Sequence, residues 1–323
     1  VFAVGDGLVV AAAAGEVPAG VRSLEAFQAR MLALKRTDEA EDAQRLLALL
    51  EGRPASPRNG KQSVPEDYEA ILLAWAALGE ELSGVLRGEP GERSQLLAQW
   101  VSCFGRYAQG VRHLNRRRTA IGLGPVTLDI CGSWGAFLHA RYLSLNRENP
   151  SLDGEEIGGR PGYTPEGAAA VSSGSHSVRG SLEEAIDEWL CCADPSLFDP
   201  KMGRACLGGG PGWWICLSRG GKASEPTRSI LGFPADGDEG IPPAFERRVS
   251  PGGFYVREAP YKGTVVTVRF LRGSPGKPSY RLLDEAGQEV PVMLVWAGNP
   301  FRFAAKDPLL PGRKYRIEVG PGG

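Results

Sequence analysis

The spacing of apolar residues divides the chain into a helical first half and a strand-rich last third. Apolar side chains recur every three or four positions through much of the first 190 residues, which is the period of a helix with one buried face. Two capping boxes mark where helices begin: Ser63 with Glu66, and Ser181 with Glu184. Six helices are predicted, over residues 24–35, 39–51, 63–82, 94–114, 131–146 and 181–190.

Beyond about residue 225 the helical period is absent, and short runs rich in valine and aromatic residues alternate with proline-glycine turns. This pattern is typical of β-strands. The strand-rich last third therefore predicts a small β-sandwich of about a hundred residues. Strands are predicted at residues 1–15, 213–218, 264–270, 291–296 and 314–319.

Length and charge limit the classes of function. A chain of 323 residues predicts two or three domains. Its formal charge of -1 leaves no global field that would attract nucleic acid or an anionic membrane. No window reaches the roughly 18 uninterrupted apolar residues of a membrane span, so we expect neither a nucleic-acid partner nor a transmembrane segment.

Glycine and proline number 44 and 25, about a fifth of the chain. We expect this excess in turns and long loops, concentrated in residues 147–180, 203–226 and 232–263. The glycine run at 207–214 has neither the strand-turn-helix context nor the lysine of a phosphate-binding loop, so it predicts a tight loop before a strand.

The six cysteines give no Cys-x-x-Cys pair, so zinc binding through thiolates is not predicted. Their density is ordinary for a chain of this length, and both oxidised and reduced states stay open. The cysteines are Cys103, Cys131, Cys191, Cys192, Cys206 and Cys216.

Residues 114–146 contain an Asn-x-x-Arg pair, a glycine-proline turn and an aspartate that suits the N-cap of the next helix. The order of Asn115, Arg118, Gly122, Pro125 and Asp129 resembles the CAP superfamily, which includes cysteine-rich secretory proteins, antigen five of venoms and plant pathogenesis-related proteins. The segments GYTPEGAAA at 162–170 and Ala185–Trp189 look like further parts of bacterial members. The tail, including FPADGDEGIPPAF at 233–245, resembles an Ig-like domain that accompanies such CAP domains.

The resemblance implies an α+β protein in three parts. A CAP-like α-β-α sandwich is expected at residues 93–222. A helical N-terminal region at 1–92 precedes it, and an Ig-like β-sandwich at 228–323 follows it.

The family also implies a cleft in which two histidines and two glutamates can bind a divalent metal. Glu166 matches the first glutamate, but Glu155 and Glu156 lie where a histidine is expected. Cys192 replaces the second glutamate, and the last histidine is absent. The cleft is therefore expected to be degenerate, with no cofactor and no assigned catalytic residue; any divalent metal would use His139 and Glu166.

Each of the three histidines could have either a structural or a functional role. His139 lies at the margin of an apolar helix face, where it is either a satisfied core side chain or the histidine that faces Glu166. His176 follows Ser175, but no Gly-x-Ser-x-Gly elbow is present, so it is a cleft candidate without a catalytic role. His113 is expected to be a cation at the C-terminal end of its helix.

Two hypotheses follow. The first is a non-catalytic binding or structural protein, secreted or in the cell envelope as the family implies, with a protein, glycan or lipid ligand. It predicts a cleft without convergent titratable groups and an exposed apolar patch. The alternative is a divalent-metal-dependent hydrolase in which His139, Glu166 and either Glu155 or Glu156 converge on one point.

Overall fold

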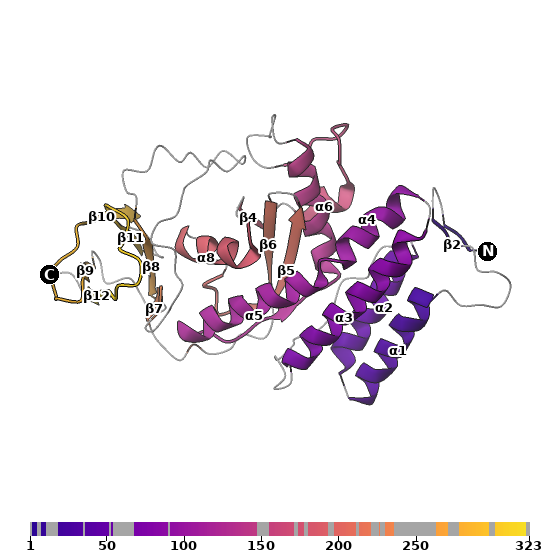
Figure 1. Ribbon diagram of the computed structural model, residues 1–323, viewed down its shortest axis with the longest axis horizontal. Helices are drawn as coiled ribbons and strands as arrows, with labels where there is room; N and C mark the ends of the chain where they lie inside the picture. The colour runs from indigo at the N-terminus through magenta and orange to yellow at the C-terminus, as the bar shows by residue number, and fades with distance from the viewer. Residues whose placement is uncertain are drawn as a thin grey trace.

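The protein, described here from a computed structural model, combines helices and strands, as the sequence predicts at this coarse level. Figure 1 shows helices at the N-terminal end, a sheet between helices at the centre and strands at the C-terminal end. The structure describes residues 2–4, 8–10, 19–34, 36–51, 53, 68–89, 91–146, 155–170, 174–177, 180–192, 197–210, 213–220, 226, 230–235, 263–270, 278–296 and 301–320.

The helices of these described residues are α1 (Ala19–Ala33), α2 (Thr37–Leu50), α3 (Tyr68–Arg87), α4 (Glu92–Val101), α5 (Phe104–Ala120), α6 (Gly132–Leu145), α7 (Pro165–Ala170) and α8 (Leu182–Cys192). The strands are β1 (Phe2–Val4), β2 (Leu8–Val10), β3 (Thr127–Leu128), β4 (Gly174–Ser177), β5 (Met202–Gly210), β6 (Trp213–Gly220), β7 (Ile230–Phe233), β8 (Val265–Phe270), β9 (Ser279–Leu283), β10 (Val292–Trp296), β11 (Phe301–Ala305) and β12 (Arg316–Gly320).

A four-stranded sheet with the order β3-β5-β6-β4 forms the centre of the molecule. β3 runs parallel to β5, whereas β5, β6 and β4 pair antiparallel. Because successive side chains of a strand point to opposite faces, β5 contacts a different helix on each side. Leu207 lies against Gly110 of α5, and Gly208 lies against the backbone of Ala136 in α6.

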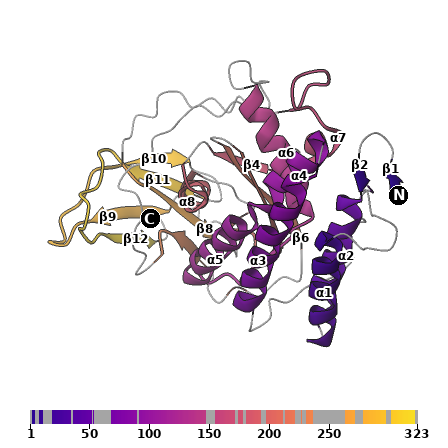
Figure 2. The ribbon, with the colours of Figure 1, turned by 45° about the vertical axis from the view of Figure 1, so that its right-hand side comes forward.

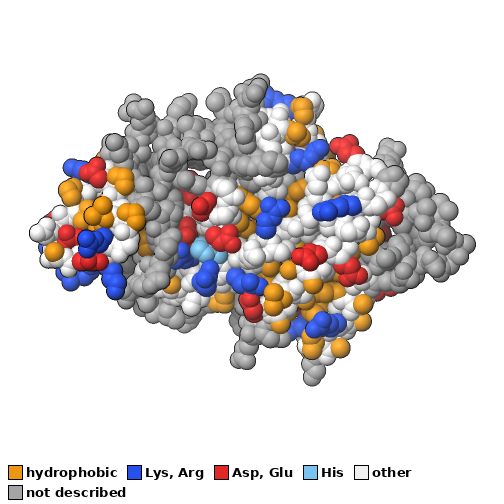
Figure 3. Space-filling model, viewed as in Figure 1, with side chains coloured by type: hydrophobic (Ala, Val, Ile, Leu, Met, Phe, Trp, Pro, Cys, Tyr) orange, Lys and Arg blue, Asp and Glu red, His pale blue; other side chains and the backbone are white. Residues whose placement is uncertain are grey.

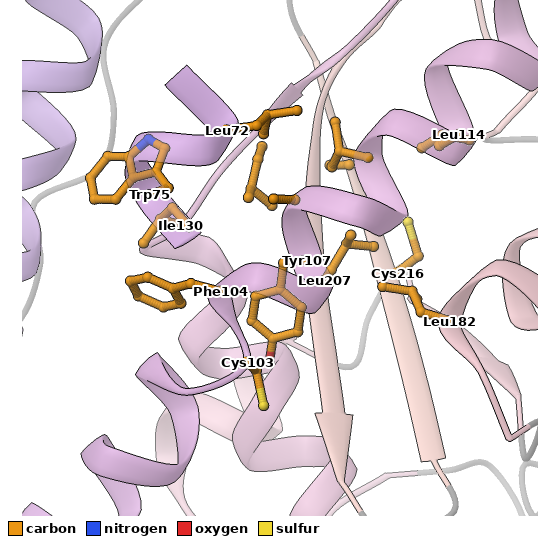
Figure 4. Packing of buried hydrophobic residues seen from close by; sticks show 14 of the residues in the cluster. Leu72, Trp75, Cys103, Phe104, Tyr107, Leu114, Ile130, Leu182, Leu207 and Cys216 are labelled. Carbon is orange, nitrogen blue, oxygen red and sulfur yellow. The ribbon is translucent and has the colours of Figure 1, made fainter. Parts of the chain in front are cut away.

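The N-terminal helices share a hydrophobic core with this central sheet. Phe27 of α1 packs against Trp75 of α3 with ring centroids 4.4 Å apart, and Trp75 meets Phe104 of α5 edge to face. Figure 4 shows Trp75, Phe104 and Leu207 in one buried cluster. The predicted boundary near residue 92 therefore lies within a continuous core.

The C-terminal strands form two sheets, one with the order β10-β11-β8-β7 and one in which β9 pairs with β12. In Figure 2 the pair β9 and β12 lies on the outer side of β8, and α8 lies on its inner side. Val266 and Val268 of β8 belong to the buried cluster that β9 and β12 cover, whereas Val265 belongs to the main core. Both faces of β8 are thus buried.

Three local predictions were wrong. The apolar start forms the hairpin β1–β2 and not one strand. The helix predicted over 94–114 is broken after Val101, where the Ser102 hydroxyl and the Cys103 thiol both donate to the carbonyl of Gln99 and compete with the regular backbone bonds.

The third is the loop predicted over the glycine run at 207–214: residues 207–210 belong to β5 and residues 213–214 begin β6, while residues 211–212 lie outside the described part of the chain. A Cβ at Gly208 would overlap the backbone of Ala136, and a Cβ at Gly209 would overlap the ring of Trp214. Glycine here permits α6 to approach the sheet closely.

The Asn-x-x-Arg pair fixes the chain after α5. Asn115 pairs with the backbone of Val126, giving its amide to the carbonyl and accepting the N–H, at 2.9 and 2.7 Å. Asp129 accepts the N–H of Gly132, the first residue of α6, at 2.8 Å, although Cys131 and not Asp129 occupies the N-cap position that the sequence predicts for Asp129.

Arg118 is fully buried, and its guanidinium donates to four backbone carbonyls. These carbonyls belong to the turn after α5 and to the turn before β5: Gly124, Leu197, Asp199 and Met202, at 2.5 to 3.4 Å. One side chain therefore connects two segments about 80 positions apart.

Replacing Arg118 by methionine should lower the free energy of unfolding by about 3–5 kcal/mol, because the buried carbonyls lose their donors. Urea unfolding of the full chain measures the difference. Arg87→Met, at an exposed position in the last turn of α3, is the matched control and should change it by less than about 0.5 kcal/mol. Equal effects of the two substitutions would contradict the assigned role.

Gly208→Ala should destabilise the protein by about 3 kcal/mol, because its methyl group can be accommodated only by moving α6 from the sheet. Gly232→Ala, in β7, adds the same methyl group where no atom lies within 4 Å. Thermal unfolding should separate the two variants clearly, and a neutral Gly208→Ala would show that α6 does not pack so closely.

Candidate functional site

His139, the best cleft candidate from the sequence, lies in α6 with 1% of its side chain exposed. Its Nδ1 is 3.1 Å from Oε1 of Glu156, whose side chain is fully buried. The imidazole also stacks on Tyr142, one turn further along the helix, with ring centroids 6.2 Å apart. The structure therefore brings together two of the predicted candidates.

Glu156 attaches the segment that follows α6 to that helix. Its second oxygen, Oε2, accepts the N–H of Thr164 at 3.0 Å, and the Thr164 hydroxyl accepts the N–H of Gly167 in the first turn of α7. Gly167 has no room for a Cβ, which would overlap Oε1 of Glu156. We call residues 155–164 the α6–α7 strap.

The other two carboxylates are exposed, whereas the side chain of Glu156 is buried. Glu166 is exposed on α7, where its backbone carbonyl lies against Gly135, one turn before His139. Glu155 is exposed at the beginning of the strap.

A carboxylate that holds the Nδ1 of a histidine is a common outer partner of metal ligands, since it orients the imidazole toward the ion. A metal needs further ligands, however, and no group of three or more His, Cys, Asp or Glu residues in the described part of the chain could hold an ion. Here the pair His139–Glu156 can fix the strap without any metal.

Two cleft positions fall outside the described side chains. His176 lies in β4, paired with Ile215 of β6 in the backbone register, and Cys192 ends α8. The Ser63–Glu66 capping box also lies outside the described residues. By contrast, Ser181 and Glu184 form their predicted reciprocal cap at the start of α8.

The surface around the strap carries large exposed apolar side chains. Leu145 at the end of α6, Ile157 and Tyr163 are 51%, 42% and 40% exposed. They are close in space, because Gly162 packs against Leu145 and the N–H of Ile157 donates to the Tyr142 hydroxyl at 3.0 Å. An exposed apolar patch therefore lies beside the predicted cleft; Leu145, Ile157 and Tyr163 are called the strap patch.

His113 does not lie at the C-terminal end of its helix, as the sequence predicts, because α5 continues two turns beyond it; His113 is buried against α8. Its Nε2 is 2.7 Å from Oδ1 of Asp187. Arg117 binds the same carboxylate with both Nε and Nη2, each at 3.0 Å, and its guanidinium lies over the ring of Phe233 in β7. A buried polar cluster therefore connects α5, α8 and the C-terminal sheet.

Burial alone would raise the pKa of Asp187, but hydrogen bonds from His113 and Arg117 outweigh it, and the pKa lies below the ordinary value for an aspartate. The carboxylate is therefore ionised in the folded protein at neutral pH.

A groove of about 900 Å³ lies beside this cluster, between α3, α5 and α8. Arg112 in the groove forms an ion pair with Glu69. Figure 3 shows acidic and basic side chains interspersed over this view of the molecule, with no single-sign field. The residues that line the groove include Tyr68, Leu72, Arg112, Arg116, Thr119 and Glu183.

Sequence reasoning missed the His113–Asp187 pair and the groove. The partners are 74 positions apart in the chain, and only the packing of α8 on α5 brings them together. The sequence carries no clear signal of the pair, because Asp187 lies one turn after Glu183 and Glu184 and resembles part of an exposed acidic face.

Among the described residues, no helix is both long and apolar enough to span a membrane. Comparison of the chain with family models, curated proteins and solved structures found no match.

Replacing Asp187 by asparagine should cost about 3 kcal/mol of unfolding free energy at pH 7, because Arg117 is left buried without its charge partner. The folded-state pKa of Asp187 is depressed, so its stabilisation is present above the unfolded value of about 3.9 and is lost as pH falls through the folded pKa. The gap between wild type and variant should therefore narrow as the pH falls below about 4.

Chemical unfolding at pH values from 7 to 2 measures that gap. Glu80→Gln, which alters an exposed carboxylate on α3, serves as the control and should show little difference from wild type throughout. A gap for Asp187→Asn that persists at the lowest pH would contradict a role for the ionised carboxylate.

Proposed function

We propose that this chain is a non-catalytic binding protein of the secreted or cell-envelope class, built on a CAP-like domain with an Ig-like C-terminal domain. The observation that carries the proposal is the arrangement around His139. Its partner is a buried glutamate that holds the strap, while Glu166 is exposed and takes no part. Both oxygens of Glu156 are thus engaged, one by His139 and one by the N–H of Thr164.

The arrangement of layers supports the CAP-like assignment. Helices α5 and α6 pack on opposite faces of the central sheet, which agrees with an α-β-α sandwich at residues 93–222. The motif residues Asn115, Arg118 and Asp129 have clear structural roles in the turns around α5 and α6. The secreted or envelope location rests on the family resemblance alone.

The strap patch supports a binding role over a catalytic one. Ile157 and Tyr163 are exposed on the strap, and Leu145 is exposed next to it. The buried side of the strap is fixed by Glu156. Binding residues commonly lie on loops held by a rigid scaffold, and clustered exposed apolar side chains mark interaction sites. The ligand class proposed is a protein, glycan or lipid that offers an apolar contact surface.

The proposal predicts that the full chain retains no stoichiometric metal. Elemental analysis after purification in zinc-containing buffer and gel filtration should give well below one zinc per chain, with no difference between wild type and His139→Ala. About one zinc per chain, lost in both His139→Ala and Glu166→Gln but kept in Glu80→Gln, would favour the metal-dependent hydrolase instead.

Binding can be tested with three probes: a glycan array, insoluble peptidoglycan, and vesicles of phosphatidylcholine with phosphatidylglycerol. A Leu145→Ser, Ile157→Ser, Tyr163→Ser variant should lose at least tenfold in affinity for the probe that the wild type binds, since central apolar contacts each contribute more than about 1 kcal/mol. Leu294→Ser with Leu310→Ser, at exposed positions of the C-terminal part, is the matched control. Equal binding by the two variants would remove the strap patch from the proposal.

A further inference from the structure

Both ring nitrogens of His113 face a polar partner. The sequence alone gives no indication of either partner. Nε2 faces Oδ1 of Asp187 at 2.7 Å, and Nδ1 faces Nη2 of Arg116 at 3.2 Å. The histidine side chain is 9% exposed, so water cannot readily replace either partner.

The donor inventory of these groups assigns the protonation state of the imidazole. A guanidinium has only donors, so the Nδ1 that faces Arg116 must carry a lone pair. The single ring proton is then on Nε2, where it is donated to the Asp187 carboxylate. The observed contacts therefore belong to a neutral imidazole in its Nε2–H form.

Adding a second proton changes one of these contacts from favourable to unfavourable. The Nδ1–H of an imidazolium points at a guanidinium that is also positively charged and also only a donor. The contact with Asp187 survives, because the carboxylate accepts from a charged ring as well as from a neutral one.

The charges around His113 identify the group that must move. Asp187 from α8 is buried and is shared with Arg117, which is also buried beneath β7. Arg116 is exposed on α5 and borders the groove. Arg116 can therefore turn into solvent, whereas Arg117 cannot leave without exposing the cluster.

The other elements packed on α5 do not alter this balance. Glu69 of α3 is paired with Arg112, and Glu183 of α8 lines the groove into which Arg116 would turn. Of the two sheet strands next to α5, β3 carries no charged residue, and Arg204 of β5 lies beside Asp129, 3.8 Å away.

We propose that His113 is a protonation switch for the position of Arg116. The neutral imidazole holds the Arg116 guanidinium at the wall of the α3–α5–α8 groove, and protonation of the imidazole releases the guanidinium into the groove. Histidine is the side chain that ordinarily changes charge between about pH 5 and pH 8. Protonation of His113 would then change the groove from one with a fixed Arg116 to one with a mobile cation. The proposed switch does not depend on the strap patch or on the proposed binding function.

The test is NMR of the full chain labelled with ¹⁵N at histidine and arginine, followed from pH 8 to pH 5. At pH 8, His113 should show a protonated Nε2 and an unprotonated Nδ1, with restricted rotation of the Arg116 guanidinium. As His113 gains its proton, the Arg116 signals should change with the same midpoint and move to averaged, mobile values. The Arg117 signals should stay those of a fixed side chain.

Two variants distinguish the proposed switch at His113 from a general response of the protein to acid. Arg116→Gln removes the positive charge beside Nδ1, so the titration midpoint of His113 should move to higher pH. Arg112→Gln, at a groove residue paired with Glu69 and not with His113, should leave that midpoint nearly unchanged.

An Nδ1–H imidazole at pH 8 would overturn the proposal. So would Arg116 signals that do not follow the titration of His113, or a midpoint that is the same in wild type and Arg116→Gln. Because the first two results come from the wild-type chain, they do not depend on whether a variant folds.

Discussion

The buried guanidinium of Arg118 is the constraint on which the central part of the structure depends. Burial lowers its pKa to about 10, so it is still charged at neutral pH. Removing such a charge from water costs several kcal/mol unless every donor finds an acceptor. Four backbone carbonyls supply the acceptors, and their segments must therefore stay where Arg118 can reach them.

This requirement positions the sheet. The turn that contains Gly124 leads into β3, and the turn that contains Leu197 and Asp199 leads into β5. Holding the two turns on one side chain places β3 beside β5 in parallel register, with Thr127 opposite Arg204. Two parallel strands cannot be joined by a tight hairpin. The hydrogen bonds of Arg118 to distant segments therefore align β3 with β5, which a local turn could not do.

Helix α5 carries Arg118 and has two further roles in the structure. Its N-terminal part contributes aromatic side chains to the core shared with α3, and His113 and Arg117 join it to α8 and β7 through Asp187. One helix thus connects the N-terminal helices, the central sheet and the C-terminal strands. The charge on Asp187 is retained in the interior because two donors, one of them permanently charged, face it.

How much of this could be predicted from the sequence depends on the distance between interacting residues. Helices with a regular apolar stripe were found, because the period depends on neighbours three and four positions apart. The reciprocal cap of Ser181 and Glu184 is equally local and was confirmed. The strand in the glycine run was missed because its glycines meet α6 and Trp214 across the sheet, and a single segment contains no sign of that contact.

The candidate site shows the same limit in its chemistry. Sequence reasoning named His139, Glu156 and Glu166, yet it could not decide which carboxylate the histidine meets. The answer depends on the strap, where Gly167 leaves space for Glu156 and Thr164 accepts the first bond of α7. The CAP-like and Ig-like assignments stay predictions, because they rest on motifs and not on a contact that distinguishes one fold from another.

The pair His139–Glu156 shows how residues suited to catalysis can become parts of a scaffold. A carboxylate that acts on a substrate or a metal must have an oxygen available at the moment of reaction. Both oxygens of Glu156 are engaged, one with the imidazole and one with the N–H of Thr164. Withdrawing either oxygen would leave a buried donor without an acceptor and would loosen the strap whose outer side carries Ile157 and Tyr163. The two bonds that hold Glu156 therefore also keep the strap in place, and with it the exposed side chains of Ile157 and Tyr163.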